Sequence, residues 1–254
     1  MAVFTLEHSL GPTYASGPCS LHGRMEDYGC QECGARRTAI CGILDDEQIV
    51  EMGRMMTQKW IEPGQFVVLE GDPGDHAYTV TEGVIKVFKS LVDGRVQITG
   101  FLLPGDFLGM PSRGQFMYSA EAISRARLCV FPRRPLLDLF DRSPGLEKRL
   151  LEIVNDELTL AQDHMLLLGR RTADERVACF LLEFAGRFSR AGWSVDPLTL
   201  PVGRGDIADY LGLSLETVSR SFSRLKKKGI LSLPNKRQVV ILEAERLNEL
   251  GGRS

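Results

Sequence analysis

The sequence predicts an α+β protein: a β-roll of the jelly-roll type, then one long helix, then a winged helix-turn-helix. Short β-like runs recur between turn residues in the first half of the chain, which is typical of a jelly roll. Apolar residues then repeat at heptad spacing, and two short helices followed by a hairpin come after them. We therefore predict a cysteine-rich segment, a β-roll, a long helix and a helix-turn-helix domain at residues 1–42, 43–142, 143–170 and 171–254.

The β-roll is predicted from short runs of strand-forming residues separated by Gly, Pro and Asp. The predicted strands are Phe66–Leu69, His76–Thr81, Val84–Ser90, Val96–Leu103, Tyr118–Ala122 and Arg127–Pro132. Before them, the stretch from Leu44 to Thr57 is predicted as a short helix. Asp45 and Asp46 lie in its first turn, where carboxylates are favourable.

The long helix is predicted to begin at Pro144, with Ser143 as its N-cap, and to end at Gly169. Apolar residues step by three and four along one face of it: Leu151, Val154, Leu158, Ala161, Met165 and Leu168. This heptad seam predicts contact with the same helix of a second copy, so we expect a homodimer. The alternative is an ordinary amphipathic helix packed on its own roll.

The strongest local pattern lies between Arg204 and Gly229. A short helix with an apolar face precedes Gly212, which can adopt the left-handed conformation of a tight corner. Ser214 can then cap a second helix. The pattern predicts a helix-turn-helix whose second helix enters the major groove of DNA.

The second helix is expected to turn Val218, Phe222 and Leu225 inward and a polar face outward. The outward residues are Glu216, Thr217, Ser219, Arg220, Ser223 and Arg224. Arg220 can donate two hydrogen bonds to guanine, Glu216 can accept one from cytosine, and Ser219 can contact either base edge. Thr217 or Ser223 can reach a phosphate. Lys226, Lys227 and Lys228 suit phosphate contacts, the alternative being a solvated helix end.

A predicted amphipathic helix over residues 174–189 precedes this pair, and a predicted hairpin over Ile230–Leu233 and Gln238–Leu242 follows it. Together they predict a winged helix-turn-helix. From Arg171 onward the chain carries 14 Lys+Arg against 10 Asp+Glu, whereas the remainder carries 17 against 23. The positive part of the chain therefore coincides with the predicted DNA-binding domain. An unrelated helical hairpin is the alternative.

Six cysteines occur, and three of them form the pattern Cys30-x2-Cys33-x7-Cys41. In a cytosolic protein such a cluster indicates metal binding or redox chemistry rather than disulfides. Four thiolates suit a [4Fe–4S] cluster or a zinc ion. The remaining cysteines are Cys19, Cys129 and Cys179. Spacing alone leaves the fourth ligand open among these three, although Cys179 lies among apolar helix residues and is expected in the core.

The run Gly205–Arg220 closely resembles the signature of the Crp/Fnr regulators, and Glu216-x-x-Ser219-Arg220 is similar to that of the FNR branch. The resemblance covers nearly the whole chain. It implies an oxygen-responsive transcription regulator, mainly an activator of anaerobic or microaerobic genes. It further implies a palindromic operator resembling TTGAT-N4-ATCAA, with one half-site per subunit, and contact with RNA polymerase near Val92–Arg95.

The same resemblance implies a [4Fe–4S] cluster held by Cys30, Cys33, Cys41 and Cys129, with Cys19 as a bystander. The spacing C-x2-C-x7-C is longer than the C-x2-C-x5-C of the best-known FNR proteins and resembles that of FnrN-like sensors. The cluster would promote pairing of two chains on the operator. The alternative is a Crp/Fnr regulator that senses redox state or nitric oxide through its cysteines, directly or with zinc.

The predicted roll also resembles a cyclic-nucleotide-binding domain, but two residues that would hold the nucleotide differ. Met110 stands where a glutamate holds the ribose, and Tyr118 stands where an arginine holds the phosphate. A buried phosphate without a cation beside it is costly. We therefore predict that the chain binds no cyclic AMP.

Other functional classes find little support in the sequence. The chain has no Gly-rich phosphate loop and no nucleophile–base signature, so we expect no enzyme. No apolar run approaches the roughly 18 residues that span a bilayer. Residues 1–11 lack the basic-then-apolar pattern of a secretory signal, so we expect a cytoplasmic protein.

Overall fold

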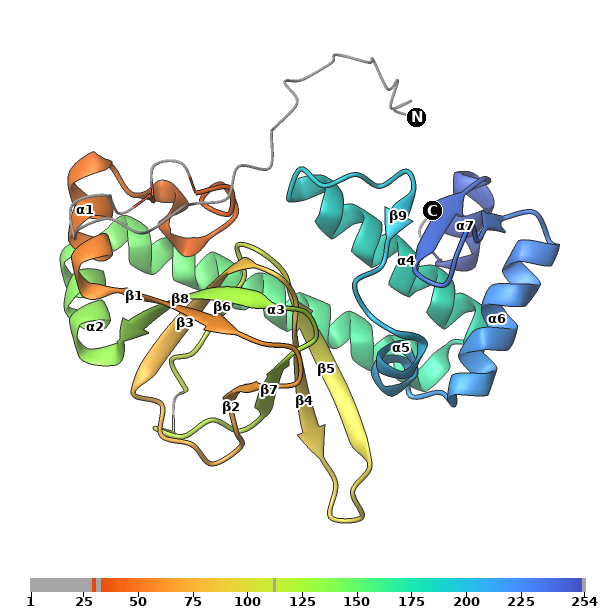
Figure 1. Ribbon diagram of the computed structural model, residues 1–254, viewed down its shortest axis with the longest axis horizontal. Coiled ribbons are helices and arrows are strands. Elements are labelled where there is room, and N and C mark those ends of the chain that lie inside the picture. The colour runs from red at the N-terminus through yellow and green to blue at the C-terminus, as the bar shows by residue number, and fades with distance from the viewer. Residues whose placement is uncertain (1–28, 31–32, 112, 253–254) are drawn as a thin grey trace.

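A computed structural model describes residues 29–30, 33–111 and 113–252 (Figure 1). A β-roll lies at one end of the molecule, a long helix runs along it, and the helix-turn-helix domain lies at the other end. The predicted α+β class, with its roll, long helix and winged helix-turn-helix, is confirmed. Cys19 and most of the predicted segment 1–42 lie outside the described residues.

The roll consists of two four-stranded antiparallel sheets, ordered β1-β8-β3-β6 and β2-β7-β4-β5. Their strands are β1 (Thr57–Ile61), β2 (Phe66–Val68), β3 (His76–Glu82), β4 (Ile85–Ser90), β5 (Val96–Leu102), β6 (Phe107–Leu108), β7 (Ser119–Ala122) and β8 (Ala126–Pro132). The six predicted strands are confirmed within about two residues, whereas β1 and β6 were not predicted. Strand β1 is exposed except at Ile61, so it lacks the alternating apolar pattern that would have predicted it.

Helices α1 (Asp46–Met55) and α2 (Arg133–Arg142) close one end of the roll. Asp45 caps α1 by accepting a hydrogen bond from the backbone N–H of Gln48. The predicted extension of this helix to Thr57 is wrong, because Thr57 opens β1 and pairs with Val130. Helix α2 was not predicted. Its apolar face is buried at Leu136, Leu139 and Phe140.

The long helix α3 (Pro144–Arg170) has proline at its first position, as predicted. Ser143 is its N-cap residue, as predicted, but the Ser143 side chain makes no capping hydrogen bond. The buried Ser143 Oγ instead accepts a hydrogen bond from Gln48 Nε2 of α1 at 3.4 Å, so this side chain ties two helices together. The helix continues one residue past the predicted end at Gly169, and its buried residues are Leu146 and Leu167.

The C-terminal domain contains the predicted helix pair and wing. Its elements are α4 (Ala173–Arg190), β9 (Leu198–Thr199), α5 (Arg204–Leu211), α6 (Leu215–Lys227), β10 (Leu231–Ser232), β11 (Gln238–Ile241) and α7 (Ala244–Leu250). The wing sheet has the order β10-β11-β9. Strand β9 and helix α7 were not predicted, because each is too short to show a period.

The roll and the C-terminal domain share one apolar core. Phe101 of β5 packs against Phe184 of α4 and Tyr210 of α5, with ring centroids 5.5 and 5.2 Å away. A second core fills the roll, and a third lies beneath the cysteines around Ile40, Met52 and Leu136. Within the part of the chain that the structure describes, no helix is long and apolar enough to cross a bilayer.

Candidate functional site

The helix-turn-helix corner depends on Gly212. This residue has φ +60°, and its N–H donates to the carbonyl of Ala208. A Cβ at this position would also lie 3.1 Å from the Leu168 side chain of α3. Glycine is therefore favoured both by the left-handed backbone and by the close approach of the long helix.

Helix α6 is amphipathic, and Val218, Phe222 and Leu225 are buried as predicted. Ser214 caps it, since its Oγ accepts a hydrogen bond from the N–H of Thr217 at 3.1 Å. Ser214 Oγ also lies 2.8 Å from Thr217 Oγ1, which keeps the Thr217 side chain against the helix start. Packing on one face and a cap at one end thus fix how α6 presents its other face.

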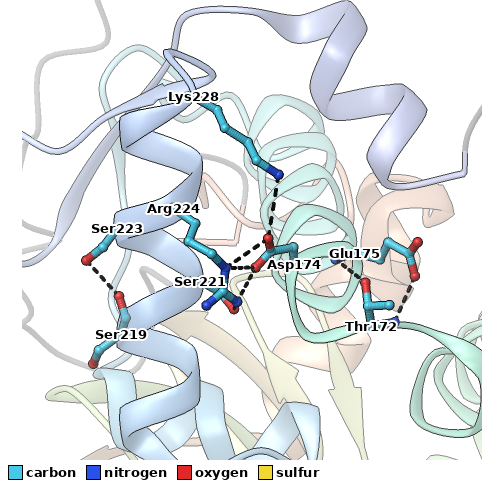
Figure 2. A network of polar contacts seen from close by, with 8 residues as sticks. All are labelled: Thr172, Asp174, Glu175, Ser219, Ser221, Ser223, Arg224 and Lys228. Carbon is cyan, nitrogen blue, oxygen red and sulfur yellow. Dashed lines mark hydrogen bonds and ion pairs between the residues drawn. The ribbon is translucent and has the colours of Figure 1, made fainter.

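Of the six predicted DNA-contacting residues only Thr217 is half-buried; the exposed ones are Glu216, Ser219, Arg220, Ser223 and Arg224. The Arg220 guanidinium donates to Glu216 Oε1 at 2.6 Å, one helical turn away. Both side chains are about 70% exposed, so this ion pair adds little stability and its partners are available to a ligand. Ser219 and Ser223 each donate to a backbone carbonyl of α6, on the side away from α4 (Figure 2).

Arg224 is exposed as predicted, with 47% of its side chain accessible, but its guanidinium pairs with α4 (Figure 2). Its Nε donates to Asp174 Oδ1 at 3.0 Å and its second terminal nitrogen donates to the same oxygen at 2.5 Å. Lys228 Nζ lies 3.8 Å from the other Asp174 oxygen. Arg224 therefore lies at the edge of the exposed face nearest α4, and a role for it in DNA contact stays a prediction.

Arg204, which the sequence analysis did not single out, lies at the start of α5 with its guanidinium 3.3 Å from the centre of the Phe222 ring. Burial lowers its pKa to about 10. Stacking of arginine on an aromatic ring is favourable and keeps the guanidinium beside Phe222 of the recognition helix. A basic residue opening the first helix of the pair was the signal available in the sequence.

The four cysteines predicted to hold a cofactor come together although Cys129 lies far from the others in sequence. Cys30, Cys33, Cys41 and Cys129 line one cavity. The cavity is otherwise bounded by apolar and small residues: Ala35, Ala39, Ile49, Met52, Gly53, Met56, Thr79, Thr81 and Phe131. Cys179 lies elsewhere, half-buried in α4, where its thiol donates to the Gly251 carbonyl at 3.4 Å.

Burial and mutual proximity favour the protonated thiols of Cys41 and Cys129. Burial raises the pKa of Cys41 to about 11, and nearby Cys33 and Cys30 raise it further. Burial likewise raises the pKa of Cys129 to about 12, followed by the effects of Cys30, Cys33 and Cys41. Thiolates in this cavity therefore require added positive charge. Among the described residues, no three His, Cys, Asp or Glu side chains are grouped closely enough to hold a single metal ion.

The segment that carries the cysteines is docked on the roll and on α3. Thr38 Oγ1 donates to the Pro104 carbonyl at 3.3 Å, and the Arg149 guanidinium of α3 donates to the Thr38 carbonyl at 3.1 Å. Arg36 donates to the Leu44 carbonyl at 2.9 Å and so closes the segment on itself. The approach is close, because a Cβ on Gly105 would collide with the Thr38 side chain. Sequence reasoning missed Thr38 and Arg149, which have no motif.

A second cavity, of about 380 Å³, lies between β5, β6, α3 and α4. Met110 and Tyr118 both line it. Its cation, Arg187, already forms ion pairs with Asp106 and Glu183. Burial and then Glu157 raise the pKa of Tyr118 to about 12. The absence of cyclic AMP binding stays a prediction, which these paired and neutral groups favour.

The predicted seam forms an apolar stripe on α3. Leu151, Val154, Leu158 and Met165 are each more than half exposed, and Ala161 is exposed as well. Leu168 differs, because it is half-buried against the core of the C-terminal domain. Val154 and Ala161 also line the cavity between α3 and the roll, so the homodimer stays a prediction, which the exposure of the stripe favours over the alternative of packing on the roll.

Comparison with known proteins agrees with this arrangement. Residues 58–143 match the cyclic nucleotide-binding domain family, and residues 175–250 match the Crp-like helix-turn-helix domain family. The nitrogen fixation regulation protein FixK of Bradyrhizobium diazoefficiens is 42% identical over 204 residues, which cover 80% of this chain and 86% of FixK. The chain belongs to the Crp/Fnr family of transcription regulators.

Further Crp/Fnr proteins are similar over nearly their full length. The transcriptional activator protein FnrL of Cereibacter sphaeroides is 38% identical over 227 residues, 88% of this chain and 92% of FnrL. The solved structure of FixK2 from Bradyrhizobium japonicum superimposes with a TM-score of 0.72 at 39% identity and covers 77% of this chain and 96% of FixK2. Crp/Fnr proteins are DNA-binding regulators, not enzymes, and this chain binds DNA through its helix-turn-helix domain.

Proposed function

We propose that this Crp/Fnr protein is an oxygen-responsive regulator, mainly an activator of anaerobic or microaerobic genes. A [4Fe–4S] cluster held by Cys30, Cys33, Cys41 and Cys129 would promote its dimerisation on a palindrome resembling TTGAT-N4-ATCAA. The observation that carries the proposal is the single cavity that these four cysteines line. The similarity to FnrL and to the fumarate and nitrate reduction regulators supports it.

The donor set fits such a cluster. The four thiols lie in a mainly apolar cavity, where the pKa values of Cys41 and Cys129 are raised, and iron cations would supply the positive charge that their thiolate forms need. When bound, the cluster would supply chemistry that is sensitive to oxygen. Met52 and Phe131 exclude water from the thiols, and Thr38 and Arg149 hold the segment in place.

The partner in the proposed dimer is a second copy of this chain. The apolar stripe of α3 is exposed and spaced like a two-helix seam. Pairing through it would bury side chains that are otherwise in water, at about 25 cal/mol per Å² of apolar surface. It would also place two copies of α6 on one face of the dimer, one for each half-site.

The outward residues of α6 are proposed to read the operator. Arg220 would donate to guanine, Glu216 would accept from cytosine, and Ser219 would contact a base edge. Thr217 or Ser223 would contact the phosphate backbone. The exposed tip of the β4–β5 hairpin, where Val92 is fully exposed, is the proposed contact with RNA polymerase.

The test is air-free purification followed by iron, sulfide and zinc analysis of three proteins: unaltered, Cys129→Ser and Cys179→Ser. We expect iron and acid-labile sulfide in the unaltered protein and in Cys179→Ser, and loss of both in Cys129→Ser. Cys179→Ser is the matched control because Cys179 lies outside the cavity. Stoichiometric zinc in a colourless protein would instead favour the zinc-dependent alternative.

The same samples test the link to DNA. Sedimentation and binding to a duplex carrying TTGAT-N4-ATCAA should show a dimer that binds without air and loses binding when oxygen is admitted. Cys33→Ser should lower dimer content and DNA affinity together. Full dimerisation and binding by Cys33→Ser would overturn the proposal. Loss of binding on nitric oxide alone, with oxygen inert, would identify a different signal.

A further inference from the structure

Helix α6 has two polar edges with different surroundings. Ser219 and Ser223 lie on the edge away from α4, whereas Ser221, Arg224 and Lys228 lie on the edge that faces it (Figure 2). The spacing of three and four residues between Ser221, Arg224 and Lys228 brings them onto one line along the helix. The basic end of α6 is therefore divided between a side open to a ligand and a side turned toward α4.

The side facing α4 is organised around one carboxylate. Asp174 lies in the first turn of α4, and its side chain is only 17% exposed. The Arg224 guanidinium donates hydrogen bonds to this carboxylate from two nitrogens, an arrangement in which arginine and carboxylate pair specifically. Arg224 also donates to Ser221 Oγ at 2.8 Å, and Ser221 is fully buried between the helices. Three polar groups from two helices thus form one connected network.

The opposite charges of Asp174 and the basic side chains of α6 favour this network. Burial would raise the pKa of Asp174, but hydrogen bonds from Arg224 and Ser221 outweigh it and lower the pKa. The carboxylate is therefore ionised at neutral pH beside the cluster formed by Arg224, Lys226, Lys227 and Lys228. A contact with a DNA phosphate would require Arg224 to leave this carboxylate and expose a partly buried charge.

We propose that Asp174 and Arg224 are a positioning pair, which sets the rotation of the recognition helix about its own axis and so aims Ser219 and Arg220 at the bases. Arg224 itself reads no DNA. This inference rests on the proposed function of α6, since it assumes that the outward residues read an operator. The buried face of α6 fixes how closely the helix packs on the domain. The Asp174–Arg224 pair fixes its rotation, which apolar packing alone would leave less defined.

The test measures affinity for the TTGAT-N4-ATCAA duplex and for a scrambled duplex of equal length, over a range of salt concentrations, with full-length protein prepared without air. Asp174→Asn and Arg224→Gln should each lower the ratio of specific to non-specific affinity about tenfold, and the double variant should lose no more than either. The slope of log affinity against log salt should stay unchanged, because no phosphate contact is removed.

Two matched controls are available in the same network (Figure 2). Glu175→Gln removes a carboxylate from the same turn of α4, but Glu175 accepts from the N–H of Thr172 and does not contact α6. It should leave the specificity ratio unchanged. Lys228→Gln removes a charge from the same edge of α6, where the contact with Asp174 is longer. It should weaken binding to both duplexes alike.

Several outcomes would overturn the inference. If Arg224→Gln makes the salt slope shallower by about 0.9 while Asp174→Asn tightens binding, Arg224 is a phosphate contact. Additive losses in the double variant would also refute a shared role. Asp174→Glu keeps the carboxylate and should retain most of the specificity, so a tenfold loss there counts against the pair. Equal affinity of the unaltered protein for both duplexes would instead reject the proposed operator.

Discussion

In the helix-turn-helix domain α4, α5 and α6 begin or end at local sequence signals, whereas residues 33–44 take most of their order from neighbouring elements. Thr172 and Ser214 cap α4 and α6, Gly212 forms the corner, and the apolar faces fill a large aromatic core. Between Cys33 and Leu44 the regular structure is the short 3-10 helix η1 (Ile40–Ile43). Few hydrogen bonds attach this segment to the roll and α3.

The difference shows where a switch can be located. A segment with little structure of its own can open at low free-energy cost, whereas a domain with a shared core opens only with the whole molecule. The proposed sensor thus lies in the region that opens at lower free-energy cost, and the DNA-binding helices lie in the more stable region. The turn around Pro104–Asp106 touches both regions, since it contacts Thr38 on one side and Arg187 on the other.

The largest expected effect is in the shared core. Phe180 is fully buried, with the rings of Phe184 and Tyr210 at 4.4 and 6.0 Å. Phe180→Ala should lower the free energy of global unfolding by about 3–5 kcal/mol, measured by denaturant titration. The control is Phe66→Ala, because Phe66 is 46% exposed. Equal losses in the two variants would contradict the contrast between core and surface.

A smaller, local effect is expected beneath the cysteines. Ile40 is fully buried, and Ile40→Ala should destabilise residues 33–44 by about 2 kcal/mol without unfolding the C-terminal domain. Amide hydrogen exchange should accelerate in this segment and stay unchanged in α4 and α6. Ile43→Ala is the control, because Ile43 lies in the same short helix but is 49% exposed. Faster exchange throughout α4 would show that the two regions unfold together.

A somewhat smaller effect on stability is expected at the turn around Pro104–Asp106, which touches both regions. Asp106 accepts hydrogen bonds from the backbone N–H of Leu103 and from the Arg187 guanidinium. Asp106→Asn keeps an acceptor but removes the charge, which should cost about 1–2 kcal/mol because Asp106 is partly exposed. Thermal unfolding measures the loss, with the exposed Asp93→Asn as control. If Asp106→Asn is as stable as that control, this turn does not connect the two regions energetically.

The smallest effect concerns pH. Burial, and to a lesser degree Arg176, lower the pKa of His164 on α3 below its usual 6.5. Its ring nitrogens are buried without a hydrogen-bond partner among the described residues, and its ring stacks 4.3 Å from Tyr210. Because the unfolded chain takes up the proton first, stability should be full above pH 6.5 and decline as the pH falls toward the folded-state pKa.

His164→Phe should remove this part of the pH dependence, while His76→Phe should retain it because His76 is exposed. Unfolding free energies at pH 7.5 and 5.5 give the comparison. An unchanged pH dependence in His164→Phe would assign it to other groups.

What could be predicted from the sequence follows the same division. The helix-turn-helix was predicted with its cap at Ser214 and its corner at Gly212, because both signals act between residues a few positions apart. The fourth cysteine could not be chosen from spacing. Its place depends on the register of β8, in which Cys129 pairs with Gln58 and Thr79.

Pairs distant in sequence were missed for a similar reason. The Asp174–Arg224 pair joins residues fifty positions apart, so nothing local distinguished Arg224 from its outward neighbours. Ser143 is the N-cap residue as predicted, but its hydroxyl bonds to Gln48 of α1, which folding brings near, and not to the start of its own helix. The helix start itself was correct because Pro144 acts through its own backbone.

The aromatic contact between β5 and α4 has a consequence for attempts to transplant the DNA reader. Phe101 packs against Phe180, Phe184 and Tyr210. A fragment that begins after α3 would lose this contact and expose an apolar surface to solvent. A chimera built by cutting between the long helix and α4 would need a donor strand that refills that face. Grafting a new reader onto this sensor is therefore a problem of matching surfaces, not only of joining linkers.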